Sequence, residues 1–414
     1  MPVSIPRNPT SNWSGVGIVG LALIASAVKL AIAYNTLGTN DAGFFHGFAK
    51  ALNQHGLEWT YQHFRLFNHP PLTAYYLRGI YVLTEQEWCR ELGIHFPFLF
   101  RLPGIVADFL VVLILLRLTR TNPRIPHWAL ALFALSPVSI MVSGYHGNTD
   151  AVMVLFLAWA AAASVWAMPI LSGTLLALSC QVKVVPLLFL PALMFFWMTR
   201  GKGPRFLIAF AVLTALLWAE PLLNFPVVFV RNVLGYSSYW GTWGISYLLH
   251  LTGLQAFSGD ELFHLSFAQQ MVSLTLKVAI GVFALIISWR RRHLPGTGLM
   301  NSIAYIWIVF FALAPGGGAQ YLIWLAPFIL MLSAPFYACL LVASSIFLFR
   351  FYDVISHGLP WFAGNSTAEL VRFWAPWTLL PWTVLIIGAT VLWRGAGIRS
   401  FRFVRSGSLQ NDPA

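Results

Sequence analysis

Twelve apolar segments follow one another along this chain, separated by polar breaks and loops, and two of the segments are short. Only 9% of the 414 residues are charged and 58% are hydrophobic, whereas soluble domains carry about 25% charged residues. Because only helices and closed barrels satisfy their backbone groups inside a bilayer, the sequence predicts an all-α polytopic membrane protein of about twelve transmembrane helices. The apolar segments lie at 15–34, 98–116, 128–143, 151–167, 170–183, 184–199, 206–222, 270–289, 299–314, 320–333, 336–350 and 376–393.

Basic residues gather on one side of this array. Arg7, three breaks and the tail together hold 14 of the 25 Lys and Arg, but only one acidic residue, Asp412. The positive-inside rule then predicts that both termini are cytoplasmic and that acidic chemistry faces outward. The orientation in the membrane explains the net charge of +12. The sequence has no stripe of basic residues interleaved with aromatic residues, so we expect no nucleic-acid partner. Arg outnumbers Lys 20 to 5 and no retrieval tail for the endoplasmic reticulum is visible, which favours a bacterial inner membrane with the active site facing the periplasm.

We expect residues 1–414 to form a single integral membrane domain with a basic cytoplasmic tail at 394–414. A long outer loop at 35–97 places Phe44, Phe48, Ala51 and Leu52 on one face at helical spacing, which predicts helices lying on the membrane surface. A second large outer loop spans 223–268. The three cysteines show no metal or disulfide spacing, and we predict neither a bound metal nor a cofactor.

The apolar run 171–198 is long enough for one tilted span. The span before this run is expected to end on the cytoplasmic side, and the basic break after the run is expected on the same side. The run must therefore cross the membrane an even number of times. The run is therefore predicted to be a hairpin of two short helices that bends at "QVKVVP", with Lys183 near the outer face.

Polar side chains at the outer side are the candidates for chemistry. Asp41 follows the first span, where it is either a helix N-cap, a role that Asn40 would fill equally well, or a carboxylate with a pKa raised by desolvation toward that of a useful base. Asn68 and His69 precede two prolines, which either start a helix or hold these side chains in a fixed place.

The turn "SGYHGNTD" between two spans brings together four polar side chains, more than helix capping needs. We predict that they contact the sugar or the acceptor, with capping by Asp150 as the alternative. They are Tyr145, His146, Asn148 and Asp150.

A lysine in an apolar run is costly, so Lys183 is either functional or snorkels to the headgroups. Arg231, with Gln320 and Tyr321 from a further outer turn, completes the outer set. Arg101 and Asp108, near and within the second span, are expected to form a structural network.

The stretches that hold these residues resemble a known family. "NHPPLTAYY", "FLFRLPGIVAD", "SGYHGNTDAV", "LALSCQVKVVPLLFLP" and "GGAQYLIWLAPF" occur in the same order as in the dolichyl-phosphate-glucose-dependent glucosyltransferases. The last stretch also looks like a segment of GPI mannosyltransferase I. The chain therefore resembles the GT-C glycosyltransferase superfamily over about 300 residues.

This resemblance implies an inverting transfer of a hexose, glucose or mannose, from a polyprenyl-phosphate donor to a hydroxyl of a lipid-linked, glycan or protein acceptor. It implies Asp41 as the catalytic base, and Asp150 is the candidate for the second acidic residue that many relatives carry. We expect Lys183 and Arg231 to stabilise the phosphate, and Gln320 and Tyr321 to contact the donor or the sugar.

Two other functions are compatible with such a chain. A twelve-span transporter or lipid-linked-glycan flippase predicts charged residues along several spans, whereas here the polar residues cluster on one side. A polymerase of lipid-linked glycans predicts larger outer loops with arginine pairs. The clustering favours the transferase.

Overall fold

The computed structural model describes residues 11–119, 125–235, 239–258 and 264–395, so most of the predicted basic tail at 394–414 lies outside it. Within these ranges the elements of regular secondary structure are helices, apart from two short strands. In the labels used here, η1 and η3 are π-helices, and η2, η4 and η5 are 3₁₀ helices. The elements are α1 Ser11–Asn35, β1 Gly38–Thr39, α2 Asn40–His63, α3 Pro71–Thr84, α4 Glu87–Glu91, α5 Phe96–Thr119, α6 His127–Ala134, α7 Pro137–Ser139, η1 Ile140–His146, α8 Asp150–Val165, α9 Pro169–Val182, η2 Val185–Phe189, α10 Leu190–Met198, α11 Gly203–Asn224, α12 Pro226–Phe229, η3 Val230–Leu234, α13 Gly244–His250, α14 Phe267–Arg290, α15 Gly296–Leu313, η4 Ala319–Tyr321, α16 Leu322–Leu332, α17 Ala334–Ile355, β2 Ala363–Gly364, α18 Ala368–Trp374, η5 Ala375–Thr378 and α19 Leu379–Gly395.

Eight helical segments in the described residues are long and apolar enough to cross a membrane. They coincide with eight of the twelve predicted segments. The other four predictions correspond to shorter apolar helices at Asp150–Val165, Pro169–Val182, Val185–Met198 and Ala319–Leu332. The chain is therefore a helical, polytopic membrane protein, as predicted, and the count of twelve crossings stays a prediction.

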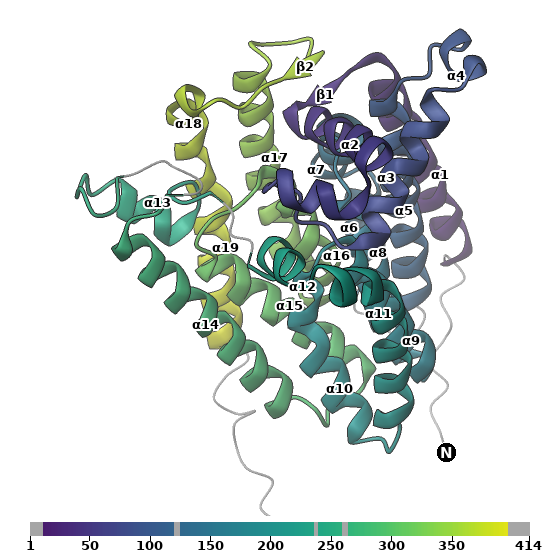
Figure 1. Cartoon of the computed structure of the whole chain (residues 1–414). Coiled ribbons are helices and arrows are strands. Elements are labelled where there is room, and N and C mark those ends of the chain that lie inside the picture. The colour runs from purple at the N-terminus through teal and green to yellow at the C-terminus, as the bar shows by residue number, and fades with distance from the viewer. Residues whose placement is uncertain (1–10, 120–124, 236–238, 259–263, 396–414) are drawn as a thin grey trace, which may run out of the picture.

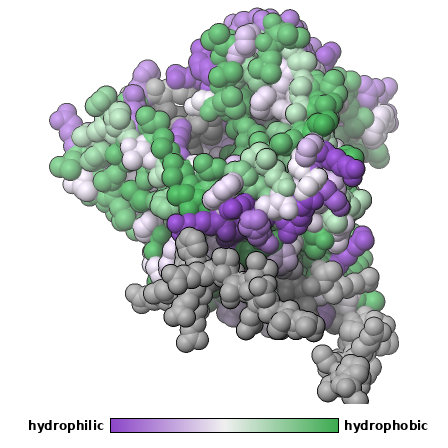
Figure 2. All heavy atoms as spheres, turned by 90° about the horizontal axis from the view of Figure 1, so that it is seen from below, coloured by the Kyte–Doolittle hydropathy of each residue, from purple (hydrophilic) through white to green (hydrophobic). Residues whose placement is uncertain are grey.

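The loop after α1 and the chain after α17 meet at one end of the molecule (Figure 1). Here β1 and β2 form a parallel pair in which Gly38 faces Ala363 and Thr39 faces Gly364. The turn between α10 and α11 and the last residues of α14 lie at the opposite end (Figure 1). Seen from that end, the surface is mostly hydrophobic, with hydrophilic residues gathered in a band across it (Figure 2).

The predicted loop at 35–97 contains the helices α2, α3 and α4. In α2, Phe48, Ala51 and Leu52 are buried, but Phe44 is exposed and Phe45 takes its place against the core. The predicted face was therefore wrong by one residue, because the packing of α2 on α3 and α5 selects its buried side chains. Pro71 opens α3, where the missing N–H of a proline costs nothing.

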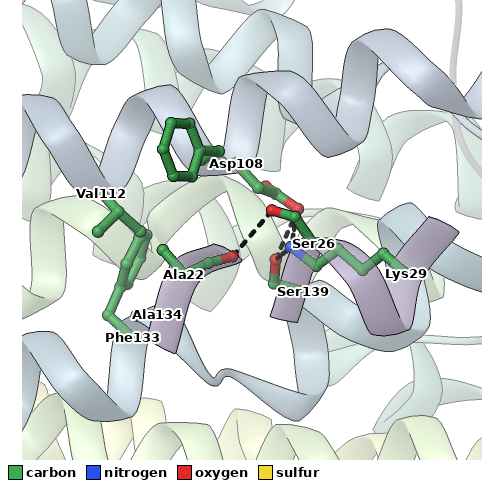
Figure 3. Close-up of a pocket in the computed structure, with 9 residues that line it drawn as sticks. Ala22, Ser26, Lys29, Asp108, Val112, Phe133, Ala134 and Ser139 are labelled. Atoms are coloured by element: carbon green, nitrogen blue, oxygen red, sulfur yellow. Dashed lines mark hydrogen bonds and ion pairs between the residues drawn. The ribbon is translucent and has the colours of Figure 1, made fainter. Parts of the chain in front are cut away.

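A buried ion pair joins α1 to the helices behind it. Lys29 Nζ lies 2.6 Å from Asp108 Oδ2 of α5 and donates to Ser139 Oγ of α7, also at 2.6 Å. Ser139 in turn donates to Asp108, so the three polar groups satisfy one another (Figure 3). The other side chains that line this small pocket are apolar, except for Ser26. Burying two opposite charges together costs far less than burying either alone. The network expected at Asp108 is therefore present, but its partner is Lys29 and not Arg101.

The apolar run 171–198 is interrupted at Lys183, as predicted. Helix α9 ends at Val182, Lys183 has an extended backbone, and the 3₁₀ helix η2 leads into α10. Pro186 lies in the first turn of η2, where it has no N–H to donate to the carbonyl of Val182 four residues earlier. The helix therefore cannot continue regularly through this point.

Candidate functional site

Asp41 lies in the first turn of α2, directly after the β1–β2 pair. The N-cap is Thr39, whose hydroxyl accepts the Asp41 backbone N–H at 3.3 Å and donates to the carbonyl of His146 at 2.9 Å. The alternative in which Asn40 or Asp41 caps this helix is therefore wrong, and the Asp41 carboxylate is left for other contacts. Gly147 follows His146 with a φ of 83°, and a Cβ there would lie 3.0 Å from the Cβ of Ala42. The two backbones thus approach closely because of this glycine.

One oxygen of Asp41 collects the hydrogen bonds of three side chains. Oδ2 accepts from His146 Nε2 at 3.0 Å, from Asn148 Nδ2 at 3.0 Å and from Gln320 Nε2 at 3.4 Å. Oδ1 makes no hydrogen bond with the described residues, and the side chain is 30% exposed. Oδ1 is therefore the oxygen available to a substrate.

The surroundings of Asp41 favour its ionised form. Burial raises the pKa of the carboxyl, but the hydrogen bond and charge of His146, the charge of Lys183 and the hydrogen bond from Asn148 outweigh it, so the pKa falls below 3.8. The raised pKa expected from desolvation was therefore wrong. At neutral pH this carboxylate is ionised and ready to accept a proton.

The π-helix η1 presents His146. Its Nδ1 lies 3.0 Å from the hydroxyl of Tyr352 in α17, so the imidazole is held on both sides, by Tyr352 and by Asp41. Tyr145 points away from the carboxylate, with its hydroxyl 2.7 Å from Ser356 Oγ, and it is only 1% exposed. Single π-turns inside helices are frequent at functional sites.

A buried arginine anchors both sides of this arrangement. Arg101 of α5 is 1% exposed, and its guanidinium donates to the Thr36 carbonyl at 2.5 Å and to the Gly144 carbonyl at 2.8 Å. Thr36 begins the segment that leads to Asp41, and Gly144 lies in η1 just before His146. Arg101 thus ties the segment before the carboxylate to the helix that carries its partner.

Asp150 and Lys183 form a second buried cluster. Lys183 Nζ lies 2.7 Å from Asp150 Oδ1, which also accepts from Trp324 Nε1 at 2.6 Å. The Lys183 amine lies 4.9 Å above the ring of Tyr321 and 5.2 Å above that of Trp324, and these two rings stack at 4.0 Å. A snorkelling lysine would have had no such partners. The Asp150 side chain is fully buried and does not cap α8, so the capping alternative was wrong too.

The remaining predicted residues lie around these clusters. His69 is 5% exposed, with Nδ1 3.2 Å from the Val182 carbonyl, and Asn68 beside it is half-buried. Burial chiefly, with the nearby charge of Lys183, lowers the pKa of His69 to about 3, so its ring is neutral. Arg231 is exposed and contacts Asn232 at 3.2 Å; in the described part of the chain no contact joins it to Asp41 or Lys183.

Sequence reasoning missed four residues that the structure brings into the site. Trp324 stood in a stretch quoted for its resemblance, and Thr39 stood beside Asp41, but neither was assigned a role. Thr73 lies in the "HPPLT" stretch, and its hydroxyl donates to the Gln181 carbonyl at 3.0 Å. Tyr352 had no local signal, because its hydrogen bond to His146 joins two distant helices.

Residues 69–199 match the MptA_B family, described as "Alpha-(1->6)-mannopyranosyltransferase, N-terminal domain". The matched segment runs from His69 through His146, Asn148 and Asp150 to Lys183 and the end of α10. No curated protein matches the chain. The matched segment covers less than half of the chain and holds half of each cluster, without Asp41, Gln320, Tyr321 and Trp324. It supports a membrane-embedded glycosyltransferase, consistent with a GT-C mannosyltransferase.

Proposed function

We propose that this protein is an inverting mannosyltransferase that uses a polyprenyl-phosphate mannose donor and an acceptor hydroxyl at the outer membrane face. The observation that carries the proposal is that an ionised carboxylate, Asp41, and a cation, Lys183, lie in two neighbouring clusters without forming an ion pair with each other. Two neighbouring residues link the clusters, because Gln320 donates to Asp41 Oδ2 at 3.4 Å and the ring of Tyr321 lies 4.9 Å from the Lys183 amine. This adjacency supports a role for both groups in one reaction. The family match to a mannopyranosyltransferase domain supports mannose over glucose.

Asp41 Oδ1 takes the proton of the acceptor hydroxyl as its oxygen attacks the anomeric carbon of mannose. The bond from that carbon to the phosphate oxygen breaks on the opposite face, so a single displacement inverts the configuration. A carboxylate of low pKa is a weak base, but an oxocarbenium-like transition state is strongly electrophilic and the proton leaves late. The hydrogen bonds of His146, Asn148 and Gln320 hold the carboxylate in place throughout.

The leaving group is a polyprenyl phosphate, which gains negative charge as the bond breaks. Lys183 stabilises that charge, and no general acid is needed, because a phosphate leaves without a proton. The stacked rings of Tyr321 and Trp324 limit where the amine can move. Asp150, which is fully buried, holds the amine in place and does not touch the sugar.

The decisive experiment is a transfer assay with the purified protein and radiolabelled donors. Polyprenyl-phosphate mannose should support transfer, whereas a nucleotide-linked mannose and polyprenyl-phosphate glucose should not. The control is Asp353→Asn, which removes a carboxylate that pairs with Arg350 outside the site. Transfer from the nucleotide sugar alone, or none from any donor, would overturn the proposal. Uptake of a lipid-linked glycan by proteoliposomes without transfer would favour the flippase alternative.

A further inference from the structure

The end of α9 leaves backbone carbonyls that the helix itself cannot satisfy. The last carbonyls of any helix lack amide partners from a following turn. Here the deficit is fixed by the sequence, because the amide four residues after Val182 belongs to Pro186, which has no N–H. An unpaired buried carbonyl costs about 1–3 kcal/mol, so a donor from elsewhere is expected.

Two side chains of the "HPPLT" stretch supply these donors. His69 Nδ1 lies 3.2 Å from the Val182 carbonyl, which cannot donate, so the ring carries its proton on Nδ1. Thr73 Oγ1 donates to the Gln181 carbonyl at 3.0 Å and approaches that of Val182 at 3.4 Å. The low pKa of His69, about 3, agrees with a neutral ring that donates through one nitrogen.

The two prolines between them determine this geometry. The residue before a proline is held extended, which places His69 ahead of α3, and the Tyr61 hydroxyl fixes its carbonyl at 2.5 Å. Pro71 then starts α3, so that Thr73 lies in its first turn and faces the same break in α9. Both side chains are buried and so are shielded from exchange with water.

We infer that His69 and Thr73 are positioning residues for Lys183. They hold the two carbonyls directly before Lys183, whose extended backbone sends its amine to Asp150. His69 therefore affects the reaction through the position of Lys183 at the donor phosphate, and it does not contact the acceptor sugar. This inference rests on the proposed role of Lys183 at the donor phosphate.

The test is a double-mutant cycle between Thr73→Val and Lys183→Gln, with transfer kinetics measured separately for donor and acceptor. Valine keeps the shape of threonine but removes one hydrogen bond, which is worth about a 3- to 10-fold effect. In the Lys183-containing protein, Thr73→Val should raise the donor KM and lower kcat/KM for the donor, with an unchanged acceptor KM. In the Lys183→Gln background it should change nothing further.

Rescue and control variants separate positioning from folding. Thr73→Ser keeps the hydroxyl and should be close to wild type, and His69→Asn, which keeps a donor near Nδ1, should be milder than His69→Leu. Thr84→Val removes another buried hydroxyl of α3, one that bonds only within its own helix, and should leave the kinetics unchanged.

An equal loss from Thr73→Val in both backgrounds would overturn the inference, as would a rise in the acceptor KM alone. If Lys183→Gln itself leaves donor kinetics unchanged, the role of Lys183 fails and this inference falls with it. If Lys183→Gln slows transfer but the effects of Thr73→Val and Lys183→Gln are additive, only the positioning role of His69 and Thr73 is overturned. Thermal unfolding of each purified variant checks that the effects arise in folded protein.

Discussion

His146 Nε2 lies 3.0 Å from Asp41 Oδ2, although His146 belongs to η1 and Asp41 to α2, far apart in the sequence. The contact requires the carboxylate to be the acceptor and the ring nitrogen the donor, since Asp41 is ionised. Asn148 donates to the same oxygen, so both hydrogen bonds use Oδ2 and Oδ1 remains available to a substrate.

Asp41→Asn should reduce the transfer rate by about 100-fold or more, the usual contribution of a general base. The amide keeps the size of the side chain but cannot take a proton, so donor binding should change little. Rates under donor saturation and a donor-binding measurement check both statements. A variant that turns over at nearly the wild-type rate would leave Asp41 a purely structural residue.

Asp150→Asn should weaken donor binding and lower the unfolding temperature together. Asparagine still offers an oxygen to Trp324 but no charge to Lys183, so the amine is freed from its 2.7 Å partner. A buried charge without its partner is strongly destabilising. Asp353→Asn, which removes one partner of the less buried Arg350–Asp353 pair, is the matched comparison for the unfolding temperature. If both variants melted alike, the Asp150–Lys183 pair would not contribute to stability.

His69 should make stability depend on pH. Its pKa is about 3 in the folded protein, against 6.5 for an ordinary histidine. Between these values the unfolded chain binds a proton that the folded chain does not, so stability is full above pH 6.5 and falls as the pH drops toward 3. Unfolding temperatures in detergent should therefore decline more steeply with acid in the wild type than in His69→Asn. Equal slopes would contradict a neutral buried ring.

Lys29 and Asp108 should be coupled. Lys29→Met leaves the Asp108 carboxylate, 13% exposed, without its ion partner, and Asp108→Leu does the same to the amine. Each single change should therefore lower the unfolding temperature more than the double change, which removes both charges. Additive losses in the double variant would show that the two groups do not depend on each other.

Sidedness can be measured with cysteine labelling. The positive-inside rule places Ser258 outside and Thr297 in the cytoplasm. An impermeant reagent should label Ser258→Cys in intact cells and Thr297→Cys only after permeabilisation. Cys339 is exposed in the structure and should first be replaced, so that it does not contribute background. The reverse pattern would place the Asp41 cluster in the cytoplasm.

Local chemistry allowed part of this site to be predicted, and packing decided the rest. Asp41, His146 and Lys183 were recognisable because polar groups at the ends of apolar segments are costly without a role. The ion pair between Asp150 and Lys183 could not be predicted, because the sequence allowed each side chain a local role, as a helix cap or as a snorkelling lysine. Only the packing of α8 on α9 brings the two side chains together. The exchange of Phe44 for Phe45 has the same origin, because neighbouring helices, and not periodicity alone, select the buried face of α2.

The two-residue pairing of β1 with β2 has a consequence for biogenesis. The backbone that leads to Asp41 is joined to Ala363 and Gly364, which are made only after nearly all of the helices. During synthesis the early helices enter the membrane long before this pairing is possible. A chain interrupted before β2 would retain most of its helices but leave the segment before Asp41 without its partner strand, so assembly of the carboxylate site is a late event in the life of the nascent protein.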